Sequence, residues 1–204
     1  MRVLVASSNP GKLRDFKAAA ALHNVEIELI SGFSAIPEAV EDGQTFEENA
    51  RKKSEHYSRF VPGELIFADD SGLEVDALGG APGVISARYA ASADSTGNSS
   101  DEANNAKLLR EMAGVTDAER TSRFVCVISV AKDGKEVAQF RGTAEGMLLR
   151  EERGTDGFGY DPLFHFPAIG KSFAELAPEE KAKVSHRGAA FRKFLEWCES
   201  SRVS

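Results

Sequence analysis

The chain has 204 residues, of which 42% are hydrophobic, and this length suffices for a single domain with one substantial core. Its formal net charge of -7 argues against a protein that binds nucleic acid through the phosphate backbone, because such proteins present clustered Lys and Arg. Only two cysteines occur, which argues against a disulfide framework.

The first elements of the chain predict an α/β arrangement. An apolar, β-branched run at Arg2–Ala6 predicts a strand, and a helical pattern extends from Lys12 to Leu22. A second apolar alternation at Val25–Ile30 predicts a strand that pairs with the first one, with the helix as the crossover. The first apolar run is too short for a signal peptide, and no run approaches the roughly 18 residues of a membrane span. We therefore expect a cytoplasmic protein with no membrane partner and no nucleic-acid partner.

The loop between the first strand and the first helix has the features of a phosphate-binding site. Free backbone N–H groups and the helix dipole attract anions at such a place, while a glycine allows close approach and a lysine adds charge. The Walker P-loop needs a second glycine and a Ser or Thr after the lysine, so this is a different loop. An ordinary helix-capping loop is the alternative. The candidate residues are Ser7, Ser8, Asn9, Pro10, Gly11 and Lys12.

An acidic pair follows the next predicted elements. Thr45 and Glu48 form the pattern of a capping box and predict a helix, and Leu65–Ala68 predicts a brief buried strand that ends at Asp69 and Asp70. Carboxylates at a strand end are well placed to hold Mg²⁺, which prefers oxygen ligands. The alternative is that the two acids begin a turn.

Glu41 is a second candidate metal ligand. It precedes the helix that begins near Thr45, and the capping pattern gives it no role. Glu47 and Glu48, by contrast, are explained by the preference of the first helical turn for acids. A solvated loop acid is the alternative for Glu41.

The middle and the end of the chain predict two helices and a hairpin. A polar stretch at 91–105 predicts an exposed loop that leads into a helix at Glu102–Met112. The β-rich runs Arg123–Ala131 and Glu136–Leu149 flank a four-residue turn, which predicts an antiparallel hairpin. Ser185–Glu199 has the spacing of an amphipathic helix.

The segment GTDGFGYDP carries candidate contacts for a flat heterocycle. Its glycines give access to the backbone, and its aromatic rings offer a stacking surface. A tight turn with two core aromatic residues is the alternative. The candidate residues are Phe158, Gly159, Tyr160 and Asp161.

Hydrogen-bond donors gather near the beginning of the last predicted helix. They are Lys181, His186 and Arg187, and Ser185 is the predicted N-cap. Positive charge in a first turn opposes the helix dipole, so an anionic or carbonyl-bearing ligand could offset the cost. A solvated charged face is the alternative. The other histidines show no partner spacing and are interpreted as structural: His23, His56 and His165.

Six motifs occur in a specific order between residues 7 and 188: SSNPGK, EDGQTFEENA, ADDSGL, GGAPGVISARY, GFGYDP and SHRG. Together they closely resemble the inosine and xanthosine triphosphate pyrophosphatase family. The resemblance implies an α/β fold with an elongated mixed β-sheet flanked by helices, two lobes and a central nucleotide cleft. It further implies one domain over residues 1–204 and assembly as a homodimer.

The resemblance also implies roles for individual residues. It implies Mg²⁺ held by Glu41 and Asp70, with Asp70 also acting as the proton acceptor. The phosphate ligands that it implies are Ser7, Asn9, Lys12 and Lys53. The contacts that it implies for the rest of the nucleotide are Ser71, the segment Phe158–Asp161, Lys181, His186 and Arg187.

The activity that the resemblance implies is hydrolysis of ITP, dITP and XTP to the monophosphate and pyrophosphate, which cleanses the nucleotide pool. The carbonyl at the six-position of the purine would accept from His186 and Arg187, whereas the amino group of adenine would confront them with a donor. One rival is a septum-formation-inhibitor-type nucleotide pyrophosphatase that acts on other modified nucleotides. Another is a non-catalytic nucleotide-binding sensor, although a sensor has no need of both Glu41 and Asp70.

Overall fold

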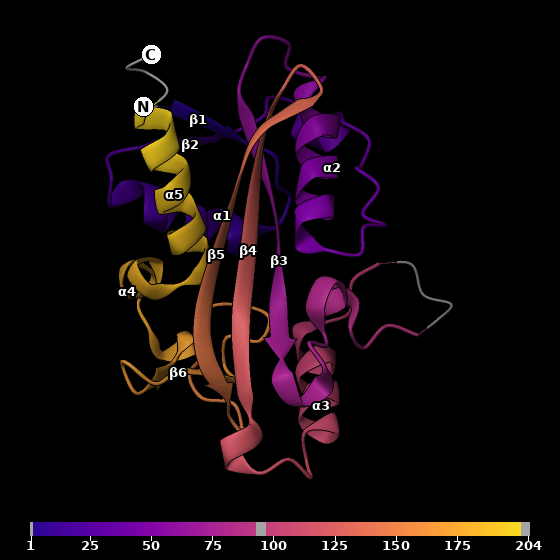
Figure 1. Ribbon diagram of the computed structural model, residues 1–204, viewed down its shortest axis with the longest axis vertical. Helices are drawn as coiled ribbons and strands as arrows, with labels where there is room; N and C mark the ends of the chain where they lie inside the picture. Colours follow the sequence, from indigo (N-terminus) through magenta and orange to yellow (C-terminus); the bar gives the residue numbers. More distant parts are fainter. Residues whose placement is uncertain (1, 93–96, 201–204) are drawn as a thin grey trace. The chain divides into compact units, whose positions relative to one another are not determined.

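The computed structural model describes residues 2–92 and 97–200. The strands form one mixed sheet in the order β2-β1-β3-β4-β5-β6-β7. They are β1 (Arg2–Val5), β2 (Glu26–Leu29), β3 (Ile66–Val75), β4 (Thr121–Lys132), β5 (Lys135–Leu148), β6 (Phe164–Phe166) and β7 (Lys171–Ser172). The helices are α1 (Pro10–Ala21), α2 (Phe46–Ser58), α3 (Asp101–Glu111), α4 (Pro178–Val184) and α5 (His186–Ser200), labelled in Figure 1. Short 3₁₀ helices lie at Phe33–Ala35, Asp76–Leu78, Gly83–Arg88, Asp117–Glu119 and Phe173–Glu175.

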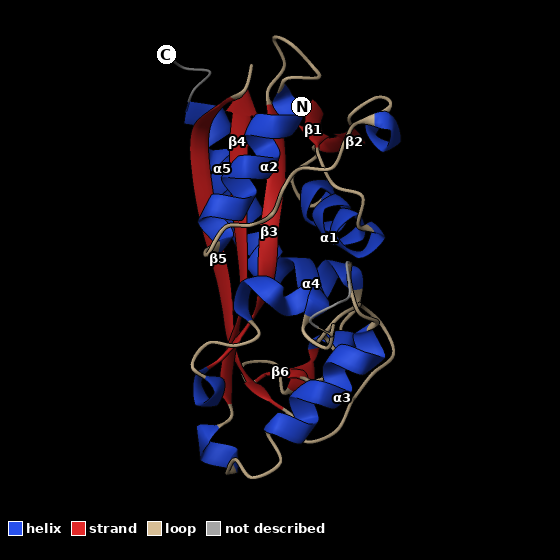
Figure 2. Ribbon diagram, turned by 90° about the vertical axis from the view of Figure 1, so that its right-hand side faces the viewer, coloured by secondary structure: helices blue, strands red, loops and turns tan. Residues whose placement is uncertain are grey.

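The chain divides into two compact units. The first takes its described residues from Met1–Asp70, Cys126–Thr143 and Ala182–Ser204, and the second from Ser71–Val125 and Ala144–Lys181. The long strands β3, β4 and β5, drawn in red in Figure 2, each contribute residues to both units. Within the described ranges, no helix combines the length and apolar character that crossing a bilayer requires.

The predicted opening of the fold is confirmed. Strand β1 pairs in parallel with β2, with Val3 opposite Ile27, and α1 is the connection between them. Helix α1 begins at Pro10 because the side chain of Asn9 caps it, accepting from the backbone N–H of Lys12 at 3.0 Å. The expected α/β fold with a mixed sheet is therefore present.

The predicted end of strand β3 was wrong. The sequence pattern placed a strand at Leu65–Ala68 and the acids after it, whereas β3 continues to Val75 and holds Asp69 and Asp70 inside it. Both acids are buried and lie beside lysines, so their charge does not require a solvated turn. The acidic pair interrupts the apolar run, and the sequence therefore suggested the end of a strand although the backbone remains extended.

The predicted hairpin is confirmed. Strands β4 and β5 are neighbours in the sheet and are joined by Asp133 and Gly134, whose φ angles are 50° and 81°. Two successive positive φ values are the signature of a type I′ turn, whose twist matches the flanking strands. The turn fixes the register of the two longest strands.

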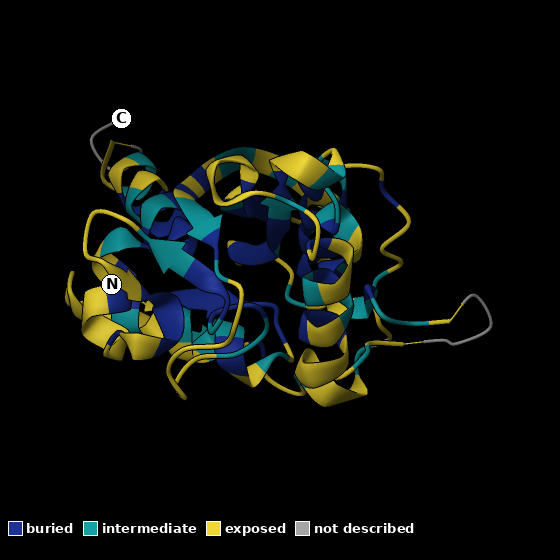
Figure 3. Ribbon diagram, turned by 90° about the horizontal axis from the view of Figure 1, so that it is seen from below, coloured by how far each residue is buried: buried dark blue, intermediate teal, exposed yellow. Residues whose placement is uncertain are grey.

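The core of the first unit lies on both faces of its strands. One cluster contains the odd-numbered Val3, Val5 and Phe67, packed with side chains of α1 and α5. The other contains the even-numbered residues Leu4, Ala6, Ile66 and Ala68, packed with Tyr57 of α2. Successive side chains of a strand point to opposite faces, so residue parity decides which helices a side chain meets. The buried residues are dark blue in Figure 3.

Helix α5 approaches its neighbours closely through two glycines. A Cβ on Gly142 of β5 would lie 2.3 Å from the carbonyl oxygen of His186, and one on Gly188 would lie 1.8 Å from that of Ala182. Neither position can therefore carry a side chain unless the backbone moves. The predicted N-cap is confirmed, since Ser185 Oγ accepts from the backbone N–H of Gly188 at 3.1 Å. Lys181, however, belongs to the separate helix α4 rather than to the beginning of the last helix.

Candidate functional site

The two parallel strands β1 and β3 end at different levels. Strand β1 pairs with β3 only at Leu4 with Ile66 and Val5 with Phe67, and β1 then ends. Strand β3 continues for several residues past this point, beside the loop that leads into α1. In open α/β sheets, ligands bind outside the carboxyl ends of the strands. Asp69 and Asp70 lie on the part of β3 that extends past the end of β1.

Asp69 faces α1 and α5, as its odd number predicts. Its Oδ2 lies 3.0 Å from Nζ of Lys12, and the Asp69 side chain is 1% exposed. Burial by itself would raise the pKa of Asp69, but Lys12, Arg187 and Lys53 outweigh that effect and hold the pKa below its usual range. Asp69 is therefore a charged partner of Lys12 at neutral pH.

Two further residues complete this face. Arg187 of α5 lies 3.0 Å from Asp15 of α1, measured from Nη1 to Oδ2, so its guanidinium is held against α1. The thiol of Cys126 lies 4.0 Å from Asp69. Burial, reinforced by the charge of Asp69, raises the pKa of the Cys126 thiol. This cysteine is thus a neutral core residue.

Asp70 faces α2. Nζ of Lys53 lies 3.1 Å from Oδ1 of Asp70 and 2.8 Å from Oε2 of Glu41, so both carboxylates reach one cation. Burial by itself would lower the pKa of Lys53, but Asp70, Glu41 and Asp69 together raise it. For Asp70 burial has the larger effect and raises its pKa, although Lys53 and Lys12 oppose the change. A carboxylate with a raised pKa is suited to accept a proton.

Asn49 is a site residue that the sequence reasoning missed. It is 1% exposed, accepts the backbone N–H of Gly43 on Oδ1 at 2.8 Å, and donates from Nδ2 to Oδ2 of Asp70 at 3.2 Å. The first contact fixes the orientation of the amide, because a backbone N–H can only meet the carbonyl oxygen. A signal existed, since Asn49 precedes Lys53 by one helical turn and shares its face.

The two sides of β3 form one electrostatic cluster. Lys12 lowers the pKa of Asp70, and Lys53 lowers the pKa of Asp69, so each lysine acts on both carboxylates. The charge of Lys12 therefore reaches Asp70, although Lys12 belongs to α1 and its ion pair is with Asp69 on the opposite side of β3.

The acids of this cluster fit a magnesium ion in their chemistry. Glu41 and Asp70 converge on a single positive group, Nζ of Lys53, so their oxygens lie close enough to share a cation. Residues 2–92 and 97–200 contain no group of three or more His, Cys, Asp or Glu side chains that could hold a metal. Two carboxylates are enough for Mg²⁺, which keeps several waters and uses substrate phosphate oxygens.

The side chains of Ser7 and Asn9 bond to the backbone of the loop and of the first turn of α1. Ser7 is buried and accepts from the backbone N–H of Asn9 at 3.3 Å, and Asn9 caps α1. The capping alternative therefore describes these two side chains. Pro10 has no backbone N–H and Asn9 accepts the N–H of Lys12, so Gly11 is the residue among the first three of α1 whose N–H helix geometry leaves for an anion.

The GFGYDP segment lies in the second unit and is held by hydrogen bonds and an ion pair of its own buried side chains. Asp161 accepts from the backbone N–H of Phe158 at 2.9 Å and lies 2.6 Å from Nζ of Lys181. That Nζ lies 5.2 Å from the centre of the Phe158 ring. The hydroxyl of Tyr160 donates to the carbonyl of Ser86 at 2.8 Å. Tyr160 and Asp161 are thus buried supports, as the tight-turn alternative predicts, and Phe158 is the half-buried ring of the segment.

The predicted residues are distributed over both units. The first unit holds the loop Ser7–Lys12, Glu41, Lys53, Asp70, His186 and Arg187. The second holds Ser71, Phe158–Asp161 and Lys181. The first set gathers the charged groups described above, and the second joins Lys181 to the aromatic segment.

Comparisons with known proteins match nearly the whole chain. A family model described as the Ham1 family matches residues 3–197. The dITP/XTP pyrophosphatase of Acidobacterium capsulatum is 51% identical over 198 residues, which are 96% of this chain and 97% of that protein. The one of Exiguobacterium sibiricum is 46% identical over 193 residues, 95% of this chain and 94% of that protein. The solved Staphylococcus aureus Ham1 protein has a TM-score of 0.81 and 39% identity, covering 98% of this chain and 100% of that chain.

Proposed function

Because this chain belongs to the Ham1 family, we propose that it hydrolyses dITP, XTP and ITP to the nucleoside monophosphate and pyrophosphate. The observation that carries the proposal is the buried cluster in which Lys12 and Lys53 act on both Asp69 and Asp70 beside the loop into α1. The curated relatives with the name dITP/XTP pyrophosphatase match this chain over nearly its full length.

The cations of the first unit take the triphosphate end of the substrate. Lys53 is buried and Lys12 is partly buried, and both lie beside buried carboxylates, where electrostatic interactions are stronger than in water. The backbone N–H of Gly11 in the first turn of α1 adds a donor for a phosphate oxygen. Arg187 contributes further positive charge on the side of Asp69. These groups hold the phosphates in place and stabilise charge on the departing pyrophosphate.

Glu41 and Asp70 are the residues that would hold Mg²⁺. When bound, the ion supplies charge neutralisation at the phosphate oxygens. Asp70 also acts as the proton acceptor. Its raised pKa suits it to this role, and its contact with Asn49 orients the carboxylate. Its carboxylate accepts a proton from water as the water oxygen bonds to the α phosphorus. The bond from that phosphorus to the bridging oxygen breaks, and pyrophosphate leaves with the electron pair.

The second unit contributes contacts for the base. The Phe158 ring offers a stacking surface, and Lys181, fixed by Asp161, offers a donor for a purine carbonyl. Ser71 and His186 are proposed as further nucleotide contacts. A site that pairs donors with the six-carbonyl of hypoxanthine or xanthine leaves an adenine amino group facing a donor, which can reject it by about 10⁴–10⁵.

A substrate panel tests the proposal. Purified protein is incubated with Mg²⁺ and dITP, XTP, ITP, ATP, dUTP or UTP, and pyrophosphate is assayed separately from orthophosphate. We expect pyrophosphate from the first three substrates and very little from ATP. Preference for dUTP or UTP would favour the septum-formation-inhibitor-type rival, binding of ITP without turnover would favour the sensor, and orthophosphate as the direct product would overturn the reaction.

Two further expectations accompany the proposed activity. We propose that the protein is a homodimer, which light scattering of the purified chain measures as twice the 22.0 kDa monomer mass. We also propose that it acts in the cytoplasm, since its substrates belong to the nucleotide pool. Fluorescence of a tagged chain in cells tests that location.

A further inference from the structure

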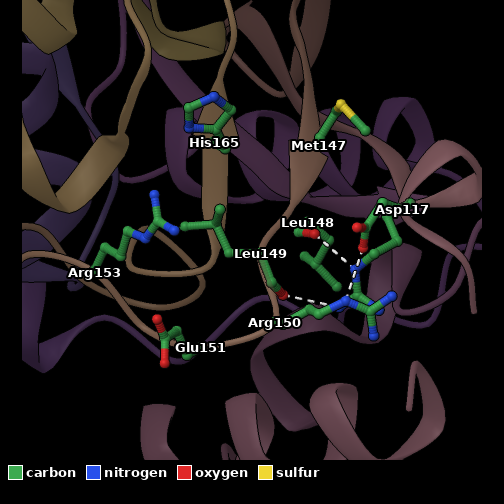
Figure 4. A pocket seen from close by; sticks show the side chains of 9 residues that line it. Asp117, Met147, Leu148, Leu149, Arg150, Glu151, Arg153 and His165 are labelled. Carbon is green, nitrogen blue, oxygen red and sulfur yellow. Dashed lines mark hydrogen bonds and ion pairs between the residues drawn. The ribbon is translucent and has the colours of Figure 1, made fainter. Parts of the chain in front are cut away.

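The second unit contains a cavity of about 510 Å³ next to the end of β5, shown in Figure 4. None of its lining residues has a role in the proposed hydrolysis. Met147–Leu149 give it an apolar wall, and its polar residues are Asp117, Arg120, Arg150, Glu151, Arg153 and His165. Three guanidinium groups thus line the cavity with two carboxylates. A volume of this size is typical of sites for small molecules, which usually measure about 300–1,000 Å³.

Arg120 carries a buried charge that no carboxylate neutralises directly. It is 3% exposed, and its guanidinium donates to the carbonyls of Leu148, Leu149 and Met112, each at 2.8 Å. Within the described ranges, no carboxylate lies at ion-pair distance from it. Carbonyls fix the guanidinium in space without cancelling its charge. A buried cation of this kind is expensive unless an anion accompanies it.

Arg150 is a second cation that lines the cavity. Its Nε donates to Asp117 at 2.7 Å, while its Nη2 donates to the carbonyl of Val115. Burial lowers the pKa of Arg120, the nearby charge of Arg150 lowers it further, and Asp117 only partly opposes them. The two guanidinium groups therefore repel each other, with Asp117 acting on both. An additional anion would relieve this repulsion.

His165 of β6 supplies a third observation, independent of the charges. Its Nδ1 is buried and has no hydrogen-bond partner among the described residues. Buried polar atoms without partners are rare in folded proteins and cost free energy. His165 lines the same cavity as the two arginines. The histidine interpreted from the sequence as structural thus has an unused polar atom at a charged cavity.

We propose that this cavity binds a small phosphate-bearing molecule, with phosphate oxygens on Arg120, Arg150 and His165. Phosphate provides several acceptor oxygens and up to two negative charges, which match two guanidinium groups better than a single carboxylate does. The apolar wall at Met147–Leu149 accommodates the uncharged part of an organic phosphate. This site is separate from the proposed active site, and its existence does not depend on the proposed reaction.

Imidazole signals in two-dimensional NMR test the proposal. The chain has four histidines, and His165→Gln assigns the signal of His165 by its disappearance. Wild-type protein is titrated with orthophosphate, pyrophosphate and inosine monophosphate at constant ionic strength. We expect a saturable shift of the His165 signal with at least one of them. Saturation by orthophosphate alone identifies free phosphate as sufficient, and a response only to the monophosphate identifies an organic phosphate.

Two arginine variants decide whether the shift reports this cavity. Arg150→Gln should weaken the binding at least about tenfold, which is the worth of one charged hydrogen bond. Arg123→Gln is the matched control, because it removes an arginine of the same unit that pairs with Asp76 and Glu145 and does not line the cavity. Equal binding by wild type and Arg150→Gln would overturn the site, as would a His165 signal that moves with no ligand or equally with sodium chloride. The signal of His186 separately reports the proposed active site, so failure of one proposal is distinguishable from failure of the other.

Discussion

On one side of strand β3, Asp69 lies against Lys12, and on the other side Asp70 lies against Lys53 and Asn49. The two carboxylates are adjacent in sequence and both are buried, yet the pKa of Asp69 is lowered and that of Asp70 is raised. Three cations, Lys12, Arg187 and Lys53, lower the pKa of Asp69. At Asp70, by contrast, burial outweighs Lys53 and Lys12, and the negative charge of Glu41 adds to its effect.

This difference follows from the alternation of side chains along a strand. Parity directs Asp69 to α1 and α5 and Asp70 to α2, so a dipeptide supplies two carboxylates with different environments. One is suited to hold a lysine in position, and the other to bind a cation or accept a proton. The following predictions test whether the two acids differ in this way.

Asp70→Asn should have the largest effect. The amide retains the shape of the carboxylate but cannot accept a proton and is a poorer magnesium ligand. We expect kcat for ITP to fall by about 10²–10⁴, the usual contribution of a general base. Rates of pyrophosphate release at saturating Mg²⁺ measure the loss. Near-normal turnover would remove Asp70 from the reaction and with it the distinction between the two acids.

Asp69→Asn should reduce turnover in a different way. Lys12 would keep its charge but lose the partner that orients it, and misplacement of a positioned group can cost about 10²-fold. We expect kcat to fall by up to that factor while KM for ITP does not rise, because the positive charge that attracts phosphate remains. The Mg²⁺ concentration for half-maximal activity should stay unchanged. If this concentration rises, Asp69 is itself a metal ligand.

Asn49→Ala should affect the side of Asp70 alone. The substitution removes the donor to Asp70 and the acceptor for the N–H of Gly43. The bond to Gly43 connects α2 to the segment that carries Glu41. Residues that orient metal ligands typically change metal affinity or activity by about 10–100-fold, and we expect the half-maximal Mg²⁺ concentration to rise by about tenfold.

The matched control for this change is Asn104→Ala. Asn104 is also a buried helical asparagine that bonds to the backbone, at Ala90 and Ala87, and it lies in the other unit. It should lower the melting temperature without changing the dependence on Mg²⁺. The same shift in both variants would show that general loss of stability, rather than orientation of Asp70, explains the result.

The sequence predicted the parts of this arrangement that depend on local pattern. The parallel pair β1 and β2, the N-cap at Ser185 and the hairpin turn at Asp133 and Gly134 follow from periodicity and turn chemistry, and all are present. The extent of β3 was missed because buried ion pairs, formed by residues distant in sequence, keep two acids inside a strand. The pairing of Asp15 with Arg187 was missed for the same reason, since these residues lie 172 positions apart.

The smallest expected effect concerns stability against pH in the metal-free protein. The folded pKa of Asp69 lies below its ordinary value of 3.8, so Asp69 contributes stability that is present above the unfolded pKa and is lost as pH falls through the folded pKa. Asp70 has the opposite sign. Its folded pKa lies above 3.8, so its ionisation costs stability at neutral pH, and this cost disappears as pH falls through the raised pKa.

Melting temperatures from pH 3 to pH 7, measured with a chelator present, therefore separate the two acids. At neutral pH, Asp69→Asn should melt about 2–4 °C below wild type, which corresponds to about 1 kcal/mol for a chain of this size. Asp70→Asn should melt at the wild-type temperature or up to about 2–4 °C above it. The difference for Asp70→Asn should shrink as pH falls through the raised pKa of Asp70, and the difference for Asp69→Asn should begin to shrink only below the ordinary pKa of 3.8. Shifts of the same sign in both variants would mean that the two sides of β3 impose the same electrostatic environment. Opposite shifts would show that the ionised carboxylate of Asp70 lowers the stability of the fold at neutral pH, as residues of functional sites commonly do.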